Sequence, residues 1–163
     1  LGAAKARDPE LMRVFAGNVH EILGGEMALH RSYMKRLGIT EEQVLHVEPA
    51  LDNLSYTHYM LAAANAGGPE EITAVILACS WSYAEIGQKL IQVQGAADHP
   101  FYGEWIRSYA SEEYAAVNDS LIELTDALAE GLPEERLAYL TKLFVNCSRY
   151  ELGFWDMAWE MRQ

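Results

Sequence analysis

Residues 69–94, PEEITAVILACSWSYAEIGQKLIQVQ, carry the clearest indication of how this chain folds. Pro69 and the two glutamates after it are typical of a first helical turn, and Gly95 is a stop signal. The first half of the stretch is apolar on nearly every side, which is the pattern of a helix buried among other elements. We therefore predict a buried helix from Ile72 to about Gln94.

Helical periodicity extends through the rest of the chain. Apolar residues recur at helical spacing after the Asp8-Pro9 start signal, and proline or glycine breaks separate the later segments. The predicted helices span residues 9–36, 51–66, 72–94, 99–109, 111–130 and 134–161, with a short acidic turn at 41–43. Strand-like alternation and internal repeats are absent. The sequence predicts one all-α domain over residues 1–163, with six or seven helices.

Composition narrows the function classes. The chain has 163 residues, is 50% hydrophobic and carries a net charge of -12. This acidity disfavours nucleic acid as a partner, and no apolar run approaches the roughly 18 residues of a membrane helix. Residues 1–10 lack a secretory signal. The cysteines, Cys79 and Cys147, lie on different predicted helices, and we expect reduced thiols in the cytoplasm.

Cys79 is a candidate nucleophile in the middle of the buried helix. Tyr83 follows four residues later, so both side chains project from one face. A lone cysteine in an apolar helix is more often a small core residue. It becomes a nucleophile only as thiolate, which needs a base or hydrogen-bond donors nearby.

Glu151 is the matching candidate for an acid or base. It shares a helix face with Phe154, three residues later, and with Cys147, four residues earlier. A buried glutamate in such a position can act as general acid or base, and Cys147 is then an alternative nucleophile. A surface ion pair with Arg149 or Lys142 is equally compatible with the spacing.

Three tyrosines and one glutamate–histidine pair are further candidate binding residues. Tyr56, Tyr83 and Tyr109 lie within apolar helical faces, which indicates core packing or a pocket for a flat heteroaromatic ligand. Glu26 and His30 share a face, but neither Glu-x-x-His nor Cys-x-x-Cys occurs. We therefore expect no metal site.

Three segments of the chain resemble the TenA (thiaminase II) family, in order and spacing. They are Cys79-Ser-Trp-Ser-Tyr83-Ala-Glu-Ile-Gly87, His99-Pro-Phe-Tyr-Gly-Glu-Trp-Ile-Arg-Ser-Tyr109-Ala and Tyr150-Glu151-Leu-Gly-Phe154-Trp-Asp-Met-Ala158. Two shorter segments, Glu26-Met-Ala-Leu-His30 and Ser55-Tyr56-Thr57, also fall in family-like places and order. The resemblance implies a haem-oxygenase-like helical fold without haem or another cofactor, and a homotetramer. It also implies hydrolysis of 4-amino-5-aminomethyl-2-methylpyrimidine to the hydroxymethyl product in thiamine salvage, and in some members cleavage of thiamine.

The same resemblance implies roles for individual residues. Cys79 would be the nucleophile and Glu151 the acid/base. Tyr83 and Tyr109 would line the site near the thiol, while Tyr56 and Phe154 would wall the pyrimidine ring. Cysteine suits this chemistry because it is both a strong nucleophile and a good leaving group.

The chain differs from the family pattern in one respect, and two other functions are alternatives to the one that the resemblance implies. Family members carry roughly two further helices before the point matching Leu1, and these supply an aspartate and an aromatic wall. We therefore expect either the tail of a longer protein or a truncated form with an incomplete pocket. As written, we do not expect the chain to be fully active, and we expect exposed apolar surface that a partner chain or swapped segment would cover. The rivals are a cofactor-handling oxidase of the pyrroloquinoline-quinone synthase or di-metal type on the same fold, and a non-catalytic pyrimidine-binding or regulatory protein.

Overall fold

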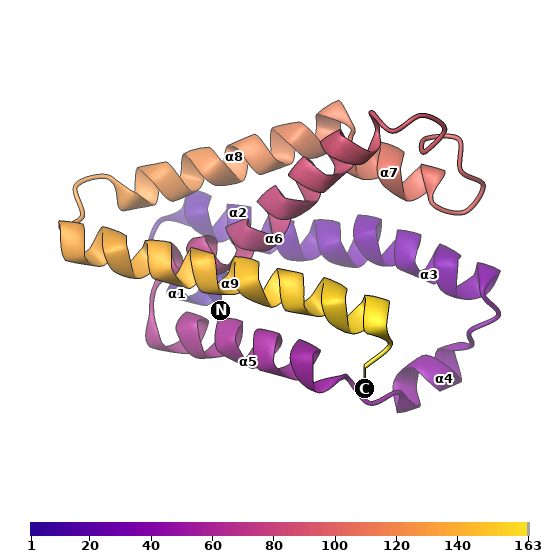
Figure 1. The fold of residues 1–163 in the computed structure, drawn as a ribbon. Helices are drawn as coiled ribbons and strands as arrows, with labels where there is room; N and C mark the ends of the chain where they lie inside the picture. The colour runs from indigo at the N-terminus through magenta and orange to yellow at the C-terminus, as the bar shows by residue number, and fades with distance from the viewer. Residues whose placement is uncertain (163) are drawn as a thin grey trace.

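The computed structural model describes residues 1–162 and is helical nearly throughout (Figure 1). The elements are α1 (Gly2–Lys5), α2 (Pro9–Glu21), the π-helical turn η1 (Ile22–Glu26), α3 (Met27–Arg36), α4 (Glu41–His46), α5 (Leu51–Ala66), α6 (Pro69–Leu90), α7 (Gly103–Tyr109), α8 (Glu112–Ala129) and α9 (Glu134–Glu160). If α2, η1 and α3 count as one interrupted helix, six helices in residues 1–162 have seven or more residues. The all-α prediction is confirmed.

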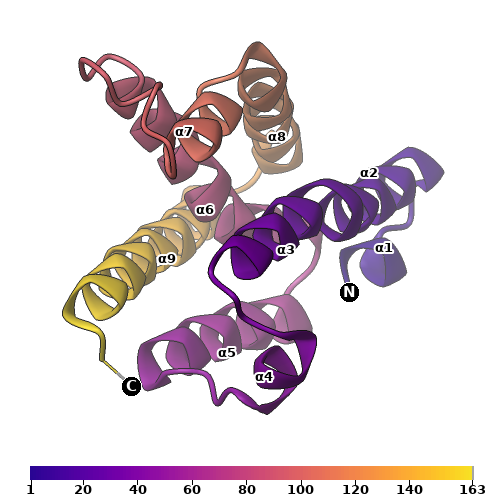
Figure 2. The same cartoon turned by 90° about the vertical axis from the view of Figure 1, so that its right-hand side faces the viewer.

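Helix α6 forms the centre of the bundle. Figure 2 shows it surrounded by α8, α9, α5 and the α2–α3 segment. Its first half is buried, as predicted, with Val75 and Ala78 each 1% exposed. The main core cluster joins α5, α6 and α9 through Tyr56, Ala63, Ala74, Val75, Ala78, Leu140, Leu143 and Cys147. The core is therefore a three-helix interface that leaves the remaining faces of α6 for α7, α8 and the N-terminal helices.

The start of α6 is held by a buried carboxylate. Glu71 is 2% exposed, accepts a hydrogen bond from the Gly68 N–H at 2.7 Å and pairs with Arg136 of α9 at 2.5 Å. Burial alone would raise the pKa of Glu71, but the Gly68 N–H and the Arg136 guanidinium hold it below its ordinary value. One side chain thus caps α6 and joins it to α9.

The connection between α6 and α7 differs from the prediction. Helix α6 ends at Leu90 rather than near Gln94, and α7 begins at Gly103 rather than near His99. The ring Nδ1 of His99 accepts hydrogen bonds from the backbone N–H groups of Phe101 and Tyr102, both at 3.1 Å. These bonds satisfy the backbone in a turn, so the helix is delayed.

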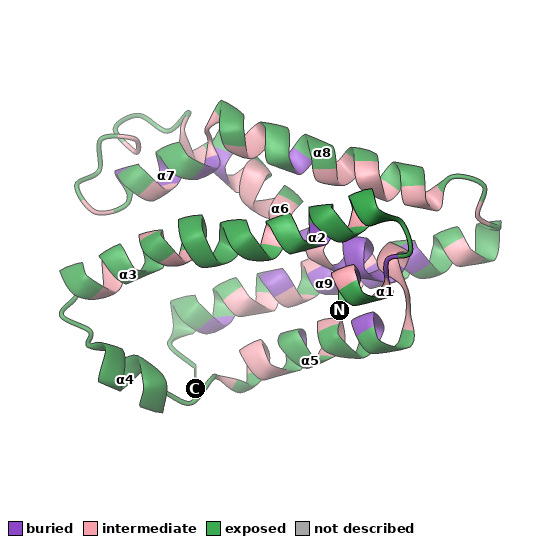
Figure 3. Ribbon diagram, turned by 180° about the vertical axis from the view of Figure 1, so that it is seen from behind, coloured by how far each residue is buried: buried purple, intermediate pink, exposed green. Residues whose placement is uncertain are grey.

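The segment from α2 to α3 packs on α1 and leaves much of its apolar surface open. Figure 3 shows most of these helices in the colour of exposed residues. Val19, Ile22 and Leu23 are 57%, 50% and 63% exposed. The expectation of exposed apolar surface had named no region, and the structure places apolar side chains of this kind at the end of α2 and in η1. No helix within residues 1–162 is both long and apolar enough to cross a membrane.

Candidate active site

The structure brings Cys79 and Glu151 together. Cys79 lies half-buried on α6, and Glu151 lies on α9 with 6% of its surface exposed. Because α9 packs along α6, the Glu151 carboxyl comes near enough to the Cys79 sulfur for its charge to raise the pKa of the thiol. The alternative of a surface ion pair for Glu151 is therefore wrong. Seventy-two positions separate the two residues in the chain, and only the packing of two helices joins them.

The environment of Cys79 keeps its sulfur protonated. Burial raises the pKa of the thiol most, and the negative charges of Glu151 and Glu26 raise it further. A neutral thiol is a poor nucleophile, so the site needs a base at the moment of attack. The Glu151 carboxyl is placed to accept that proton.

Tyr56 of α5 faces the same pair with an unsatisfied hydroxyl. Its ring stacks on Tyr150, with centroids 5.5 Å apart and planes 9° apart. The hydroxyl is buried and makes no hydrogen bond of ordinary geometry with any residue in 1–162. Burial, followed by the nearby Glu151 carboxylate, raises the pKa of Tyr56. A buried hydroxyl without a partner costs about 1–3 kcal/mol, which is typical of a position that a ligand satisfies.

Tyr83 and Tyr109 form an aromatic wall beside the thiol. Their ring centroids lie 4.9 Å apart, and Trp105 and Trp155 lie 5.9 and 5.8 Å from Tyr83. Burial is the main reason why the pKa values of both tyrosines are raised. Phe154 is half-buried one turn from Glu151, with its ring centroid 6.3 Å from Trp155. Among the described aromatic rings, Phe154 forms a ring pair with Trp155 and none with the site tyrosines.

Two residues at the site had been given no role there from the sequence. Glu26 accepts a hydrogen bond from the Tyr109 hydroxyl at 3.4 Å, and Tyr114 packs edge-on against Tyr109 with centroids 4.8 Å apart. The pKa of Tyr114 is raised to about 12, chiefly by burial. The spacing of Glu26 and His30 indicated a shared face, but nothing in the sequence connected that face with Tyr109. Tyr114 carried no signal.

Cys147 belongs to the core rather than to the site. It is 0% exposed and packs in the cluster formed by α5, α6 and α9. Burial, followed by the Glu151 charge, raises its pKa to about 11. Both cysteines are free thiols. Cys147 therefore shares a face with Glu151, as predicted, but lies where no solvent reaches it.

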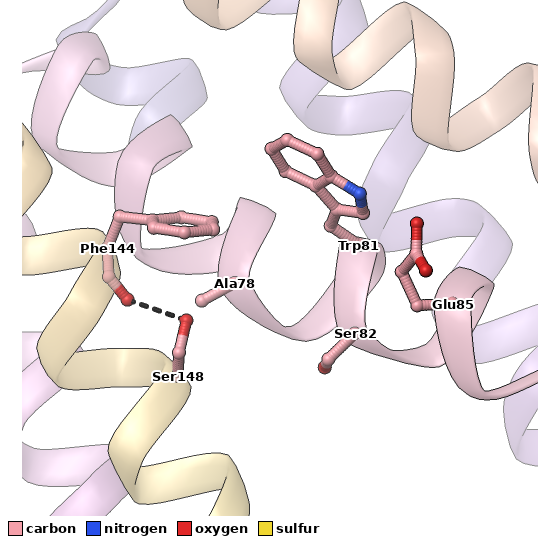
Figure 4. A pocket seen from close by; sticks show the side chains of 6 residues that line it. All are labelled: Ala78, Trp81, Ser82, Glu85, Phe144 and Ser148. Carbon is pink, nitrogen blue, oxygen red and sulfur yellow. Dashed lines mark hydrogen bonds between the residues drawn. The ribbon is translucent and has the colours of Figure 1, made fainter.

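A separate hollow lies between α6 and α9. Figure 4 shows its lining, which consists of Ala78, Trp81, Ser82, Glu85, Phe144 and Ser148. The volume of this hollow is about 280 Å³. A second hollow of about 200 Å³ adjoins it through Trp81 and Phe144. Neither includes Cys79 or Glu151, so both are distinct from the candidate site. Within the described residues, no three histidine, cysteine or carboxylate side chains converge as a metal site would require.

The fold and the site together define an all-α bundle with a cysteine–glutamate pair among tyrosines. The model of the TENA/THI-4/PQQC family matches residues 1–161. The chain belongs to this family, which confirms the resemblance found in the three sequence motifs.

Individual relatives support the same assignment. The chain is 47% identical over 162 residues to an aminopyrimidine aminohydrolase of Halalkalibacterium halodurans. The aligned region covers 99% of this chain and 72% of that relative. It is 40% identical over 160 residues to an aminopyrimidine aminohydrolase of Helicobacter pylori, covering 98% and 74%. The solved TenA homologue from P. horikoshii OT3 is 30% identical with a TM-score of 0.82, covering 98% and 72%. The chain thus spans about seven-tenths of the length of these proteins.

Proposed function

We propose that this protein is an aminopyrimidine aminohydrolase. It converts 4-amino-5-aminomethyl-2-methylpyrimidine into the 5-hydroxymethyl product, with Cys79 as nucleophile and Glu151 as acid/base. The observation that carries the proposal is the meeting of the Cys79 thiol with the Glu151 carboxyl beneath a set of tyrosines. The names of the two bacterial relatives support the substrate class.

The first step is a proton-coupled addition. Glu151 takes the thiol proton as the sulfur of Cys79 forms a bond to the ring carbon next to the aminomethyl-bearing carbon. Glu151 then gives that proton to the ring nitrogen, so no net charge accumulates on the ring. A carboxyl group that both accepts and returns a proton is the role of a general acid/base.

The second step exchanges amine for water. The lone pair of the 4-amino group pushes through the ring, and the bond between the exocyclic methylene and the protonated amine breaks with its electron pair on the nitrogen, so that ammonia leaves and a 4-iminium group forms. Water then adds its oxygen to the methylene, the electron pair returns to the 4-iminium nitrogen, and the extra proton of the water passes to the departed ammonia. The carbon–sulfur bond breaks, and the sulfur recovers the ring proton through Glu151. Cysteine suits both the first and the last step of this reaction, because its sulfur is a strong nucleophile and a good leaving group.

The aromatic residues hold the ring in this scheme. Tyr56 offers an unpartnered hydroxyl beside Glu151, and Tyr83 lies between the thiol and Tyr109. Phe154 supplies an apolar wall on the Glu151 side of α9. A ring fixed between such groups needs little reorganisation to reach the transition state.

Compartment and assembly follow as further parts of the proposal. The two free thiols support a reducing compartment, and we place the protein in the cytoplasm. The exposed apolar side chains of α2 and η1, with Val19, Ile22 and Leu23 at least half exposed, support a homo-oligomer such as a tetramer.

The test is ammonia release from the aminomethylpyrimidine by the purified protein and three variants. Cys79→Ala and Glu151→Gln should each lower turnover at least about 10³-fold, because both groups act in one unit. Cys79→Ala should retain its helical circular dichroism and its binding of the hydroxymethyl product. Cys147→Ala is the matched control and should keep turnover. Full activity of Cys79→Ala would refute the assigned nucleophile.

A further inference from the structure

Glu26 reaches the site from an unusual piece of backbone. The π-helical turn η1, Ile22–Glu26, interrupts an otherwise continuous helix and ends at this residue. It contains Gly24 and Gly25, each about 1 kcal/mol less favourable than alanine inside a helix. A Cβ at either glycine would meet nothing within 4 Å, so packing does not require them. Single π-helical turns within α-helices occur frequently at functional sites.

The Glu26 carboxylate has one occupied and one open oxygen. Its Oε1 accepts the hydrogen bond from the Tyr109 hydroxyl at 3.4 Å and lies 3.5 Å from Nε2 of His30. Within residues 1–162, Oε2 makes no hydrogen bond or ion pair. The side chain is 46% exposed. Tyr109 and His30 therefore orient the carboxylate and leave an oxygen free for a ligand.

The two carboxylates of the site lie beside different tyrosines. Glu26 accepts the hydrogen bond of the Tyr109 hydroxyl, whereas the residue before Glu151 stacks its ring on Tyr56. The charge effects agree with this geometry, because after burial the largest charge effect on the pKa of Tyr56 comes from Glu151 and that on Tyr109 comes from Glu26. Both charges raise the pKa of the Cys79 thiol. Glu26 therefore lies on the Tyr109 side of the site.

We propose that Glu26 binds the protonated aminomethyl group of the substrate, which is the group that leaves. This assignment rests on the proposed function. With Glu151 at the ring nitrogen and Cys79 at the adjacent ring carbon, the substituent of the ring extends toward the Tyr109 end. An aliphatic amine is a cation at neutral pH, and a carboxylate with a free oxygen binds it through a charge-assisted hydrogen bond.

The placement has a chemical consequence for the leaving step. A nearby carboxylate favours the protonated form of an amine. The amine then departs as neutral ammonia, because its three protons are already in place when the carbon–nitrogen electron pair moves onto nitrogen. Glu26 thereby selects for substrates with a cationic leaving group over the neutral hydroxymethyl product.

The experiment measures binding without turnover. In the Cys79→Ala protein, calorimetry compares the dissociation constants of the aminomethyl- and hydroxymethylpyrimidine before and after Glu26→Gln. The added substitution should weaken aminomethylpyrimidine binding about 10- to 100-fold, the range for a hydrogen bond to a charged group. Binding of the hydroxymethyl compound should change less than about twofold. Glu21→Gln removes an exposed carboxylate from the same segment and should leave both unchanged.

Each other outcome is decisive. Equal weakening of both compounds would assign Glu26 to positioning Tyr109 only, and no weakening of either would remove it from the site. Both results overturn the proposal while leaving the hydrolase function standing. Failure of the Cys79→Ala protein to bind either pyrimidine, before Glu26 is changed, contradicts the proposed function and this inference with it.

Discussion

Replacing Glu151 with glutamine should make the Cys79 thiol more reactive toward an alkylating agent while it abolishes turnover. The two effects have opposite signs because the carboxylate plays two parts. In the free protein its negative charge opposes formation of the thiolate. Burial is the main cause of the raised pKa of Cys79, and the charge of Glu151 is the next largest. In the reaction it removes the proton, which glutamine cannot do.

The size of the reactivity change follows from the contact between the two groups. Two unit charges about 4 Å apart interact with about 1 kcal/mol in water and about 4 kcal/mol at an effective dielectric constant of 20. Cys79 is half-buried, so its environment lies between these limits. Because about 1.4 kcal/mol corresponds to a factor of ten in the ionised fraction, the thiolate population should rise by about fivefold to several hundredfold.

The assay is the rate of iodoacetamide modification at pH 8.5, followed by mass spectrometry in the Cys147→Ala background. Ammonia release on the same samples gives turnover. Glu85→Gln, which neutralises an exposed carboxylate facing the hollow in Figure 4, should change neither rate. An unchanged or slower alkylation rate in the Glu151→Gln protein would refute the close approach of carboxyl and thiol.

Two further predictions concern stability. A Cβ at Gly87 would lie 2.6 Å from the backbone of Tyr109, so Gly87→Ala should lower the free energy of unfolding by about 1–3 kcal/mol in urea. Gly17 has nothing within 4 Å of such a Cβ, so Gly17→Ala should raise the free energy of unfolding by up to about 1 kcal/mol. The unfolding free energy should also fall as pH rises from about 9 to 11, because the raised pKa of Cys147, about 11 against an ordinary 9.0, keeps it protonated in the folded state while the unfolded chain ionises. Serine at Cys147 should make that fall shallower, because the raised pKa values of Cys79 and the site tyrosines act in the same direction. A fall of unchanged slope in the Cys147→Ser protein would contradict the burial of this thiol.

The helices themselves were predictable from local signals. Proline and glycine breaks, capping residues and apolar periodicity gave the helices from Pro9 to Arg36, from Leu51 to Ala66 and from Glu134 onward. Where the prediction failed, a side chain or a backbone contact outside the periodic pattern had decided the outcome. His99 closes a turn with its own ring nitrogen, and the π-helical turn before Met27 has no periodic signature.

The candidate site, too, was predicted in part by local sequence patterns and decided in part by tertiary packing. The sequence placed Cys79 with Tyr83, and Glu151 with Phe154, because residues three or four apart share a helix face. Which faces meet depends on how α9 lies against α6, and that is set by burial of apolar surface over the whole interface rather than by any local pattern. Only the tertiary structure therefore joined the thiol to the carboxyl, enclosed Cys147, and turned Glu26 toward Tyr109.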